Sequence, residues 1–122
     1  MLLSSMSTTG ARCALATSAV VVKIVAITSA MGSTAEHDGT ALIYRSSKAA
    51  LNNAMRGLAQ RLKVDGMTVL LIHPGWVKTH MGGKNATLTP EVSVSAMRKI
   101  ISTLAPGDSG RYVSYAGAEI SW

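Results

Sequence analysis

One stretch decides the fold of this chain, Met67-Thr68-Val69-Leu70-Leu71-Ile72-His73, which ends at Pro74-Gly75. Residues 69–72 form an apolar run with no polar alternation, and this is typical of a strand that is covered on both faces of a parallel sheet. Residues 23–28, Lys-Ile-Val-Ala-Ile-Thr, form a second run rich in β-branched residues. The two runs therefore predict two buried, parallel strands.

Helical patterns separate and follow these strands. Residues 42–63 place apolar side chains at helical spacing, and Asp65-Gly66 is a stop signal. A second helix is expected over residues 92–104, after an entry at Thr89-Pro90, and a third strand over residues 111–115. The order strand, helix, strand, helix, strand predicts an α/β fold with a parallel sheet and right-handed crossovers.

Composition limits the classes of protein to which the chain can belong. It has 122 residues and 48% hydrophobic residues, which suits one small domain. The net charge of +6 raises the possibility of nucleic-acid binding. However, the basic residues are scattered, and no aromatic residues are interleaved with them for base stacking, so we expect no nucleic-acid partner. Cys13 is the one cysteine, and the histidines do not have metal-ligand spacing, so we expect no disulfide within the chain and no metal site.

Residues 1–22 are a poorly specified lead-in, rich in Ser, Thr and Ala. The first 35 residues contain no Asp or Glu, as in a transit peptide. The apolar run at residues 19–27 is interrupted by Lys23 and is too short to span a bilayer. We therefore expect no membrane association and a cytoplasmic location, which is the default for a chain without disulfides.

The candidate chemistry lies on the first predicted helix and after the first strand. Tyr44 and Lys48 are four residues apart, so they share one helix face. A free phenol has a pKa near 10, and a neighbouring cation favours its charged form, as a proton-transfer catalyst requires. Ser29 follows the strand at its carboxyl end, where ligands of open α/β sheets bind. Two alternatives remain open: the Tyr–Lys pair could be an ordinary amphipathic pair, and Ser29 a turn residue with Ser33 as the functional serine.

Three motifs in order resemble the second half of a short-chain dehydrogenase/reductase. They are ITSAMGS at residues 27–33, YRSSKAALN at residues 44–52 and IHPGWVKT at residues 72–79. The wording of the second motif, together with residues 81–83 and 115–122, is similar to the C-factor-like branch of that family. The resemblance implies a partial Rossmann-type parallel sheet, made of the last three strands with two crossover helices. Residues 23–122 would be the C-terminal catalytic half of that domain.

The resemblance also implies roles for individual residues. Tyr44 would be the general acid or base toward a carbonyl or alcohol substrate, and Ser29 would hold and polarise the substrate oxygen. Lys48 would stabilise the phenolate and, with Tyr44, bind the nicotinamide ribose of NAD or NADP. The nicotinamide ring would be oriented by Pro74, Gly75, Trp76, Val77 and Thr79. Family members commonly assemble through their long helices, so a homo-oligomer formed through helix 42–63 is also implied.

The sequence departs from the family at its front half. Gly10 stands alone and the next glycine is Gly32, so there is no glycine-rich turn to receive a dinucleotide pyrophosphate. The alternative function is therefore a truncated, catalytically inert fragment that lacks the dinucleotide-binding half. On either hypothesis we expect weak or no NAD(P)H binding by the isolated chain. The strand at 23–28 would also keep one unpaired edge.

Overall fold

The computed structural model describes residues 20–122. Residues 1–19, with most of the expected lead-in at 1–22, lie outside the described residues. The elements are, in chain order, β1 (Lys23–Ile27), η2 (Ala30–Gly32), α2 (Leu42–Leu62), η3 (Lys63–Asp65), β2 (Thr68–His73), α3 (Pro90–Thr103), η4 (Pro106–Asp108) and β3 (Arg111–Ser114). None of the described helices is long and apolar enough to cross a membrane.

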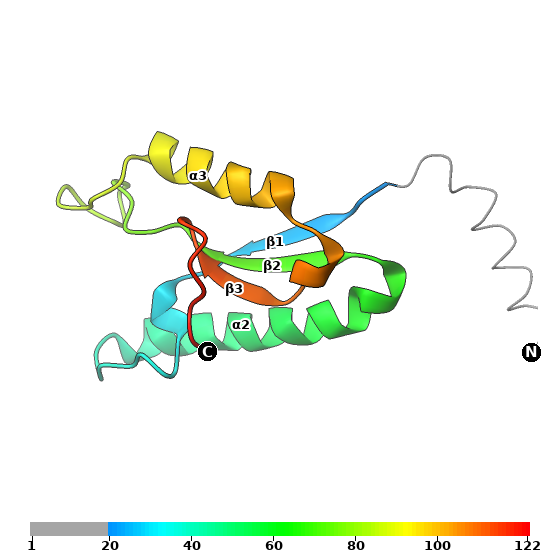
Figure 1. The fold of residues 1–122 in the computed structure, drawn as a ribbon. Coiled ribbons are helices and arrows are strands. Elements are labelled where there is room, and N and C mark those ends of the chain that lie inside the picture. Colours follow the sequence, from blue (N-terminus) through cyan, green and yellow to red (C-terminus); the bar gives the residue numbers. More distant parts are fainter. Residues whose placement is uncertain (1–19) are drawn as a thin grey trace, which may run out of the picture.

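The three strands form one parallel sheet in the order β1-β2-β3. The register pairs Ile27 of β1 with Ile72 of β2, and Ile72 in turn with Val113 of β3. Figure 1 shows α2 on one face of this sheet and α3 on the other, so the described part of the chain has three layers. This confirms the predicted fold class, a partial Rossmann-type sheet of three parallel strands with two crossover helices.

Element boundaries differ slightly from those expected. The helix expected at 92–104 begins two residues earlier, at Pro90, because the Thr89 side chain caps it by accepting a hydrogen bond from the Val92 N–H at 3.3 Å. Proline fits in the first turn because its missing N–H has no partner there. The third strand ends at Ser114 instead of residue 115, where the Gly117 N–H donates to the Ser114 carbonyl and closes a turn.

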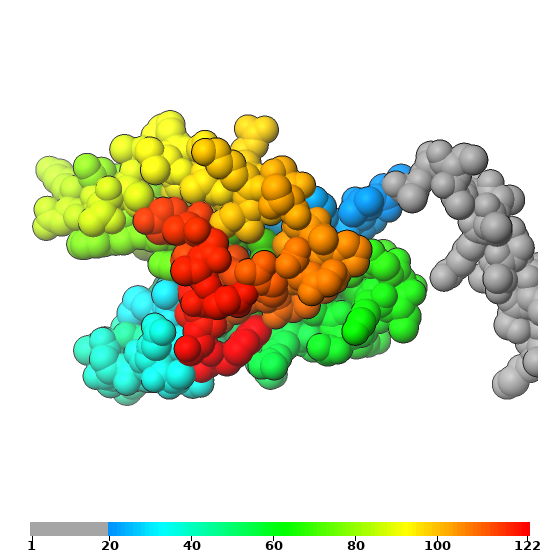
Figure 2. All heavy atoms as spheres, viewed as in Figure 1, coloured from blue at the N-terminus to red at the C-terminus, as the bar shows by residue number. Residues whose placement is uncertain are grey.

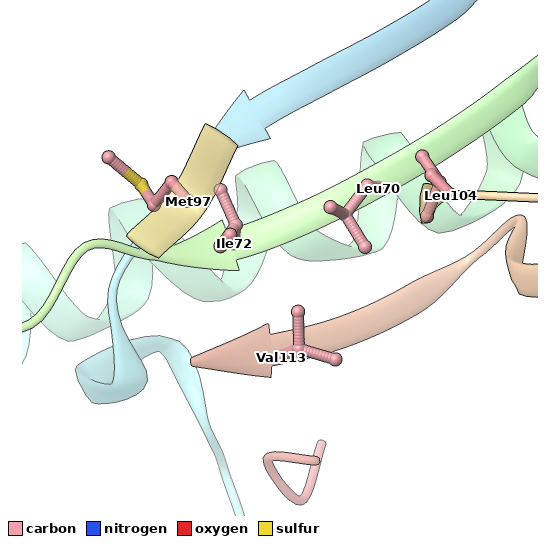
Figure 3. Close-up of a cluster of buried hydrophobic side chains, with 5 residues drawn as sticks. All are labelled: Leu70, Ile72, Met97, Leu104 and Val113. Atoms are coloured by element: carbon pink, nitrogen blue, oxygen red, sulfur yellow. The ribbon is translucent and has the colours of Figure 1, made fainter. Parts of the chain in front are cut away.

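The hydrophobic core is centred on β2, and its apolar residues 69–72 are fully buried. Successive side chains of a strand point to opposite faces, so this run serves both helical layers. On one face a cluster forms from Leu70, Ile72, Met97, Leu104 and Val113 (Figure 3). Met97 lies beside Ile72 at the carboxyl end of β2, at the opposite end of the cluster from Leu104.

The two edge strands of the sheet differ in whether their outer edge is hydrogen-bonded. Residues 118–120 lie along β3, where the Ile120 N–H donates to the Tyr112 carbonyl at 2.9 Å and Val113 forms an antiparallel bridge with Glu119. The outer edge of β1 has no strand partner among residues 20–122, as the sequence predicted. The outer edge of β3 is therefore covered by residues 118–120, whereas the outer edge of β1 is unpaired within residues 20–122.

The C-terminal residue, Trp122, packs between distant segments. Its ring lies 5.3 Å from the Tyr112 ring, and the Arg56 guanidinium of α2 lies over it at 4.4 Å. Its carbonyl oxygen accepts hydrogen bonds from the Ala35 N–H at 2.9 Å and the Thr34 hydroxyl at 3.0 Å. The tail thus ties β3 and α2 to the segment that follows β1.

Candidate active site

A cavity of about 720 Å³ lies beyond the carboxyl ends of β1 and β2. Its walls come from residues 28–31 after β1, Tyr44 of α2, His73 at the end of β2 with residues 74–77, 79, 81 and 82 of the following loop, and the first turns of α3. Figure 2 shows the molecule hollowed there, between the loop before α3 and the segment that joins β1 to α2. Ligands of open parallel sheets bind in this position because the loops after neighbouring strands diverge there.

Ser29 lies in the wall of this cavity and is held by its neighbours. It is 6% exposed, and its hydroxyl oxygen accepts a hydrogen bond from the Met31 N–H at 3.1 Å. Its carbonyl oxygen accepts a hydrogen bond from the Tyr112 hydroxyl at 2.5 Å. The other candidate, Ser33, is buried, caps the Glu36 N–H and is not among the residues that line the cavity. Of the two serines, the cavity thus contains Ser29.

Tyr44 and Lys48 lie on the same face of α2, as their spacing predicts. The Lys48 Nζ lies 5.6 Å from the centroid of the Tyr44 ring. Tyr44 lines the cavity, whereas Lys48 is not among the lining residues. The ammonium is therefore placed to act on the Tyr44 phenol.

Arg45, between these two residues, anchors the segment that precedes the helix. It is 7% exposed, forms an ion pair with Asp38 at 2.8 Å and donates to the Met31 carbonyl at 3.5 Å. The pKa of the Asp38 carboxyl is lowered, chiefly by hydrogen bonds from Thr40 and also by the Arg45 charge. The start of α2 is thereby joined to η2.

The loop after β2 forms the opposite wall, and all five residues predicted to orient the nicotinamide line the cavity. The Ser93 hydroxyl of α3 donates to the Pro74 carbonyl at 2.6 Å, and the Trp76 indole N–H donates to the Gly82 carbonyl at 2.8 Å. Gly75 has a φ of 83°, and a Cβ there would collide with the side chains of Leu88 and Tyr115. These contacts give the loop a fixed shape.

His73, the last residue of β2, also lines the cavity. It is half-buried, and burial lowers the pKa of its imidazole. Its Nδ1 is buried and has no hydrogen-bond partner among the described residues. In residues 20–122 there is also no group of three or more side chains that could hold a metal ion.

Sequence reasoning missed the residues that support the site from behind. The Thr28 hydroxyl donates to the Asn52 side chain at 2.6 Å and so joins the end of β1 to α2. Asn52 is the last residue of the motif at residues 44–52, so the sequence could have indicated its part in the site. Tyr112 and Ser93 gave no such signal, because their partners lie 83 and 19 residues away in the chain.

The Tyr112–Ser29 contact gives a stability prediction. Burial raises the pKa of the Tyr112 phenol, so the group is a neutral donor, and it is 1% exposed. Tyr112→Phe should lower the free energy of unfolding by about 1–3 kcal/mol, since the Ser29 carbonyl loses its buried donor. Tyr115→Phe, whose hydroxyl makes no hydrogen bond within residues 20–122, is the matched control. Urea denaturation checks the difference, and equal losses in the two variants would contradict the proposed contact.

Comparisons with known proteins place this geometry among reductases. A family model described as Enoyl-(Acyl carrier protein) reductase matches residues 3–113. C-signal of Myxococcus xanthus is 46% identical over 101 residues, which cover 82% of this chain and 61% of C-signal. A 1-hydroxy-2-glutathionyl-2-methyl-3-butene dehydrogenase of Rhodococcus sp. (strain AD45) is 35% identical, over 82% of this chain and 46% of the dehydrogenase.

Solved structures of carbonyl reductases superpose on this chain as well. Carbonyl reductase Sniffer of D. melanogaster superposes with a TM-score of 0.78 at 37% identity, covering 82% of this chain and 41% of Sniffer. The NADPH-bound carbonyl reductase from chicken fatty liver gives 0.76 at 37% identity, over 82% of this chain and 42% of the reductase. This chain thus spans between 41% and 61% of the length of these four proteins.

Proposed function

Since the chain belongs to the short-chain dehydrogenase/reductase family, we propose that it carries the catalytic site of an oxidoreductase acting between NAD or NADP and a carbonyl or alcohol substrate. Residues 23–122 are then the catalytic half of the family's Rossmann domain. One observation carries the proposal. Ser29 and Tyr44 line the same cavity as the loop at 74–79, and the Lys48 ammonium stands beside the phenol.

The loop after β2 supports binding of the nicotinamide end of the cofactor. The cavity volume of about 720 Å³ is within the range typical of small-molecule sites. Its wall at Pro74, Gly75 and Val77 is apolar, as suits the face of a nicotinamide ring, and the Ser93 hydroxyl donates to the Pro74 carbonyl. Trp76 and Thr79 complete that wall. A bound nicotinamide would supply hydride to a carbonyl carbon or accept it from an alcohol.

The residues of the chain would handle the proton. The Ser29 hydroxyl accepts the Met31 N–H, which leaves its own proton free for donation to the substrate oxygen. The Tyr44 phenol would deliver its proton to that oxygen as the carbon receives hydride, and would regain it from the alcohol in the reverse reaction. The Lys48 ammonium favours the phenolate that remains, because an opposite charge nearby stabilises the charged form. Acid–base chemistry of this kind contributes about 10²–10⁴ in rate.

Loss of NADPH absorbance in the presence of a simple methyl ketone, such as 2-octanone, tests this proposal. We expect slow oxidation of NADPH that depends on the concentrations of ketone, cofactor and chain. Formation of 2-octanol in amounts equal to the NADPH consumed must accompany it. Absence of alcohol at millimolar cofactor would contradict the proposed activity.

A second candidate is a chain that has no turnover of its own. The observation that favours it is the sequence itself, which contains no Gly-x-x-x-Gly-x-Gly turn to receive the cofactor pyrophosphate. On this hypothesis the geometry of the site is that of the family, but the cofactor is not held. The affinity for the cofactor and the presence of product separate the two candidates.

The isolated chain should bind NADPH weakly, with a Kd of about 1 mM. Reduced nicotinamide mononucleotide should bind within about threefold of the same value, because the cavity contacts only the part that both molecules share. Fluorescence titration measures both constants. Thr79→Val should weaken both ligands, whereas Thr103→Val, on an exposed turn of α3 outside the cavity, should change neither. Micromolar binding of NADPH would show that this expectation is wrong.

A further inference from the structure

The cavity wall carries no formal charge. The chain has 12 Lys and Arg residues and 6 Asp and Glu residues, and none of those within residues 20–122 lines the cavity. The Lys48 ammonium lies over the Tyr44 ring, 5.6 Å from its centroid, and Lys48 is not among the lining residues. A substrate that carries a carboxylate or phosphate would therefore find no cationic partner among the described walls.

The two titratable residues in the wall, Tyr44 and His73, also provide no positive charge for an anionic ligand. Tyr44 is a phenol, and His73 is an imidazole whose pKa is lowered by burial. A lowered pKa keeps the imidazole neutral at pH 7, so it supplies no positive charge to an anion. Burial of an unpaired anion against neutral walls is strongly unfavourable.

Apolar side chains from three separate elements line the cavity in addition to the catalytic and cofactor residues. Met31 comes from η2, Met81 from the loop after β2, and Val94 and Met97 from α3. Met97 is 8% exposed and belongs to the buried cluster, where Figure 3 places it at the carboxyl end of β2. The apolar wall is thus continuous with the protein core. Methionine side chains are flexible and polarizable, so they adapt to apolar groups of different shape.

The mouth of the cavity is apolar as well. Trp76, Met81 and Val94 are 53%, 80% and 49% exposed, although all three are large hydrophobic residues. Exposed apolar residues gathered at the rim of a pocket mark a binding surface for an apolar partner. Both the depth and the entrance of the cavity therefore favour the same kind of ligand.

We propose that the substrate is a neutral aldehyde or ketone, or the corresponding alcohol, whose apolar body lies against Met31, Met81, Val94 and Met97. Carbonyl compounds that carry a carboxylate or phosphate on that body are rejected. This inference rests on the proposed function, because Ser29 and Tyr44 are what direct the carbonyl group in the cavity. It adds the chemical class of the substrate.

Calorimetric titration of the chain with 2-butanone, 2-hexanone, 2-octanone and 7-oxooctanoate tests this inference without cofactor. Affinity should rise by about fourfold for each added methylene, which is the value for full burial of apolar surface. The keto acid has the chain length of 2-octanone but ends in a carboxylate, and it should bind at least about tenfold more weakly. Equal affinity of these two ligands, no dependence on chain length, or no binding of any ketone would each overturn the proposal.

Two lysine substitutions test whether the cavity wall is the part of the chain that discriminates against the carboxylate. Met81→Lys places a cation at the rim, on a side chain that is 80% exposed, so the fold should tolerate it. We expect this variant to bind 7-oxooctanoate about tenfold more tightly and 2-octanone more weakly. Val64→Lys adds the same charge at an 81% exposed position of η3, outside the cavity, and should change neither affinity. Identical behaviour of the two variants would overturn the assignment of this wall.

The readouts separate this inference from the proposed function. Selective binding of neutral ketones without formation of an alcohol would contradict the proposed reductase activity but support the proposed class of ligand. Reduction of 7-oxooctanoate at the same rate as 2-octanone would support the proposed reductase activity but contradict the proposed class of ligand.

Discussion

Tyr44→Phe is expected to slow NADPH-dependent ketone reduction by about 10²–10⁴-fold, because the substituted ring cannot give a proton to the substrate oxygen. Its ring still fills the same place in the cavity wall, and the Lys48 ammonium still has an aromatic face beside it. The affinities for 2-octanone and NADPH should therefore fall much less than the rate, by no more than the loss of the hydroxyl's hydrogen bonds. Single-turnover measurements at millimolar NADPH, with alcohol quantified, would record the loss in the chemical step.

Lysine variants distinguish a catalytic pair from an ordinary helix pair. Lys48→Met removes the charge beside the phenol and should slow the same step, by less than Tyr44→Phe does. Lys63→Met removes an exposed charge at the far end of α2 and serves as the matched control. A Tyr44→Phe protein that keeps its rate within about threefold would contradict the assigned role of the phenol, whatever the lysine variants do.

Leu70→Ala is expected to lower the free energy of unfolding by about 2–5 kcal/mol. Leu70 lies at the centre of β2, is fully buried and belongs to the cluster formed with α3. The substitution removes apolar contacts and leaves a space that the strands on either side cannot readily fill. A domain of this size has only about 5–15 kcal/mol of stability in total, so this loss is a large fraction of it.

Urea denaturation followed by circular dichroism measures this effect. Val64→Ala is the control, since Val64 is 81% exposed on η3 and should cost little. If Leu70→Ala unfolds the chain completely, Ile72→Val deletes one methyl group from the same cluster and should cost about 0.5–1.5 kcal/mol. Losses no larger than that of the control in both variants would show that the cluster is not a packed core.

The sequence determined the fold well because its signals are local. The apolar run at 69–72 identified the central strand, and the helical spacing in residues 42–63 identified α2. Tyr44 and Lys48 share a face for the same reason, since four residues make about one helical turn. The boundary error at α3 arose from one cap, where Thr89 starts the helix at Pro90.

The remaining features depend on contacts between distant segments. No periodicity indicates that the Tyr112 hydroxyl holds the Ser29 carbonyl, or that Ser93 holds Pro74. That Tyr44 lines the cavity and Lys48 does not also follows from tertiary packing. The residue roles, an assembly through helix 42–63 and a cytoplasmic location all stay predictions.

The open side of the sheet has a consequence for the site. Ser29 follows β1, the strand whose outer edge has no partner among residues 20–122. Any polypeptide that docked in parallel along this strand would leave the sheet next to that serine, and its next residues would border the cavity. Completion of the sheet on this side would then also enclose the cavity wall that Ser29 forms.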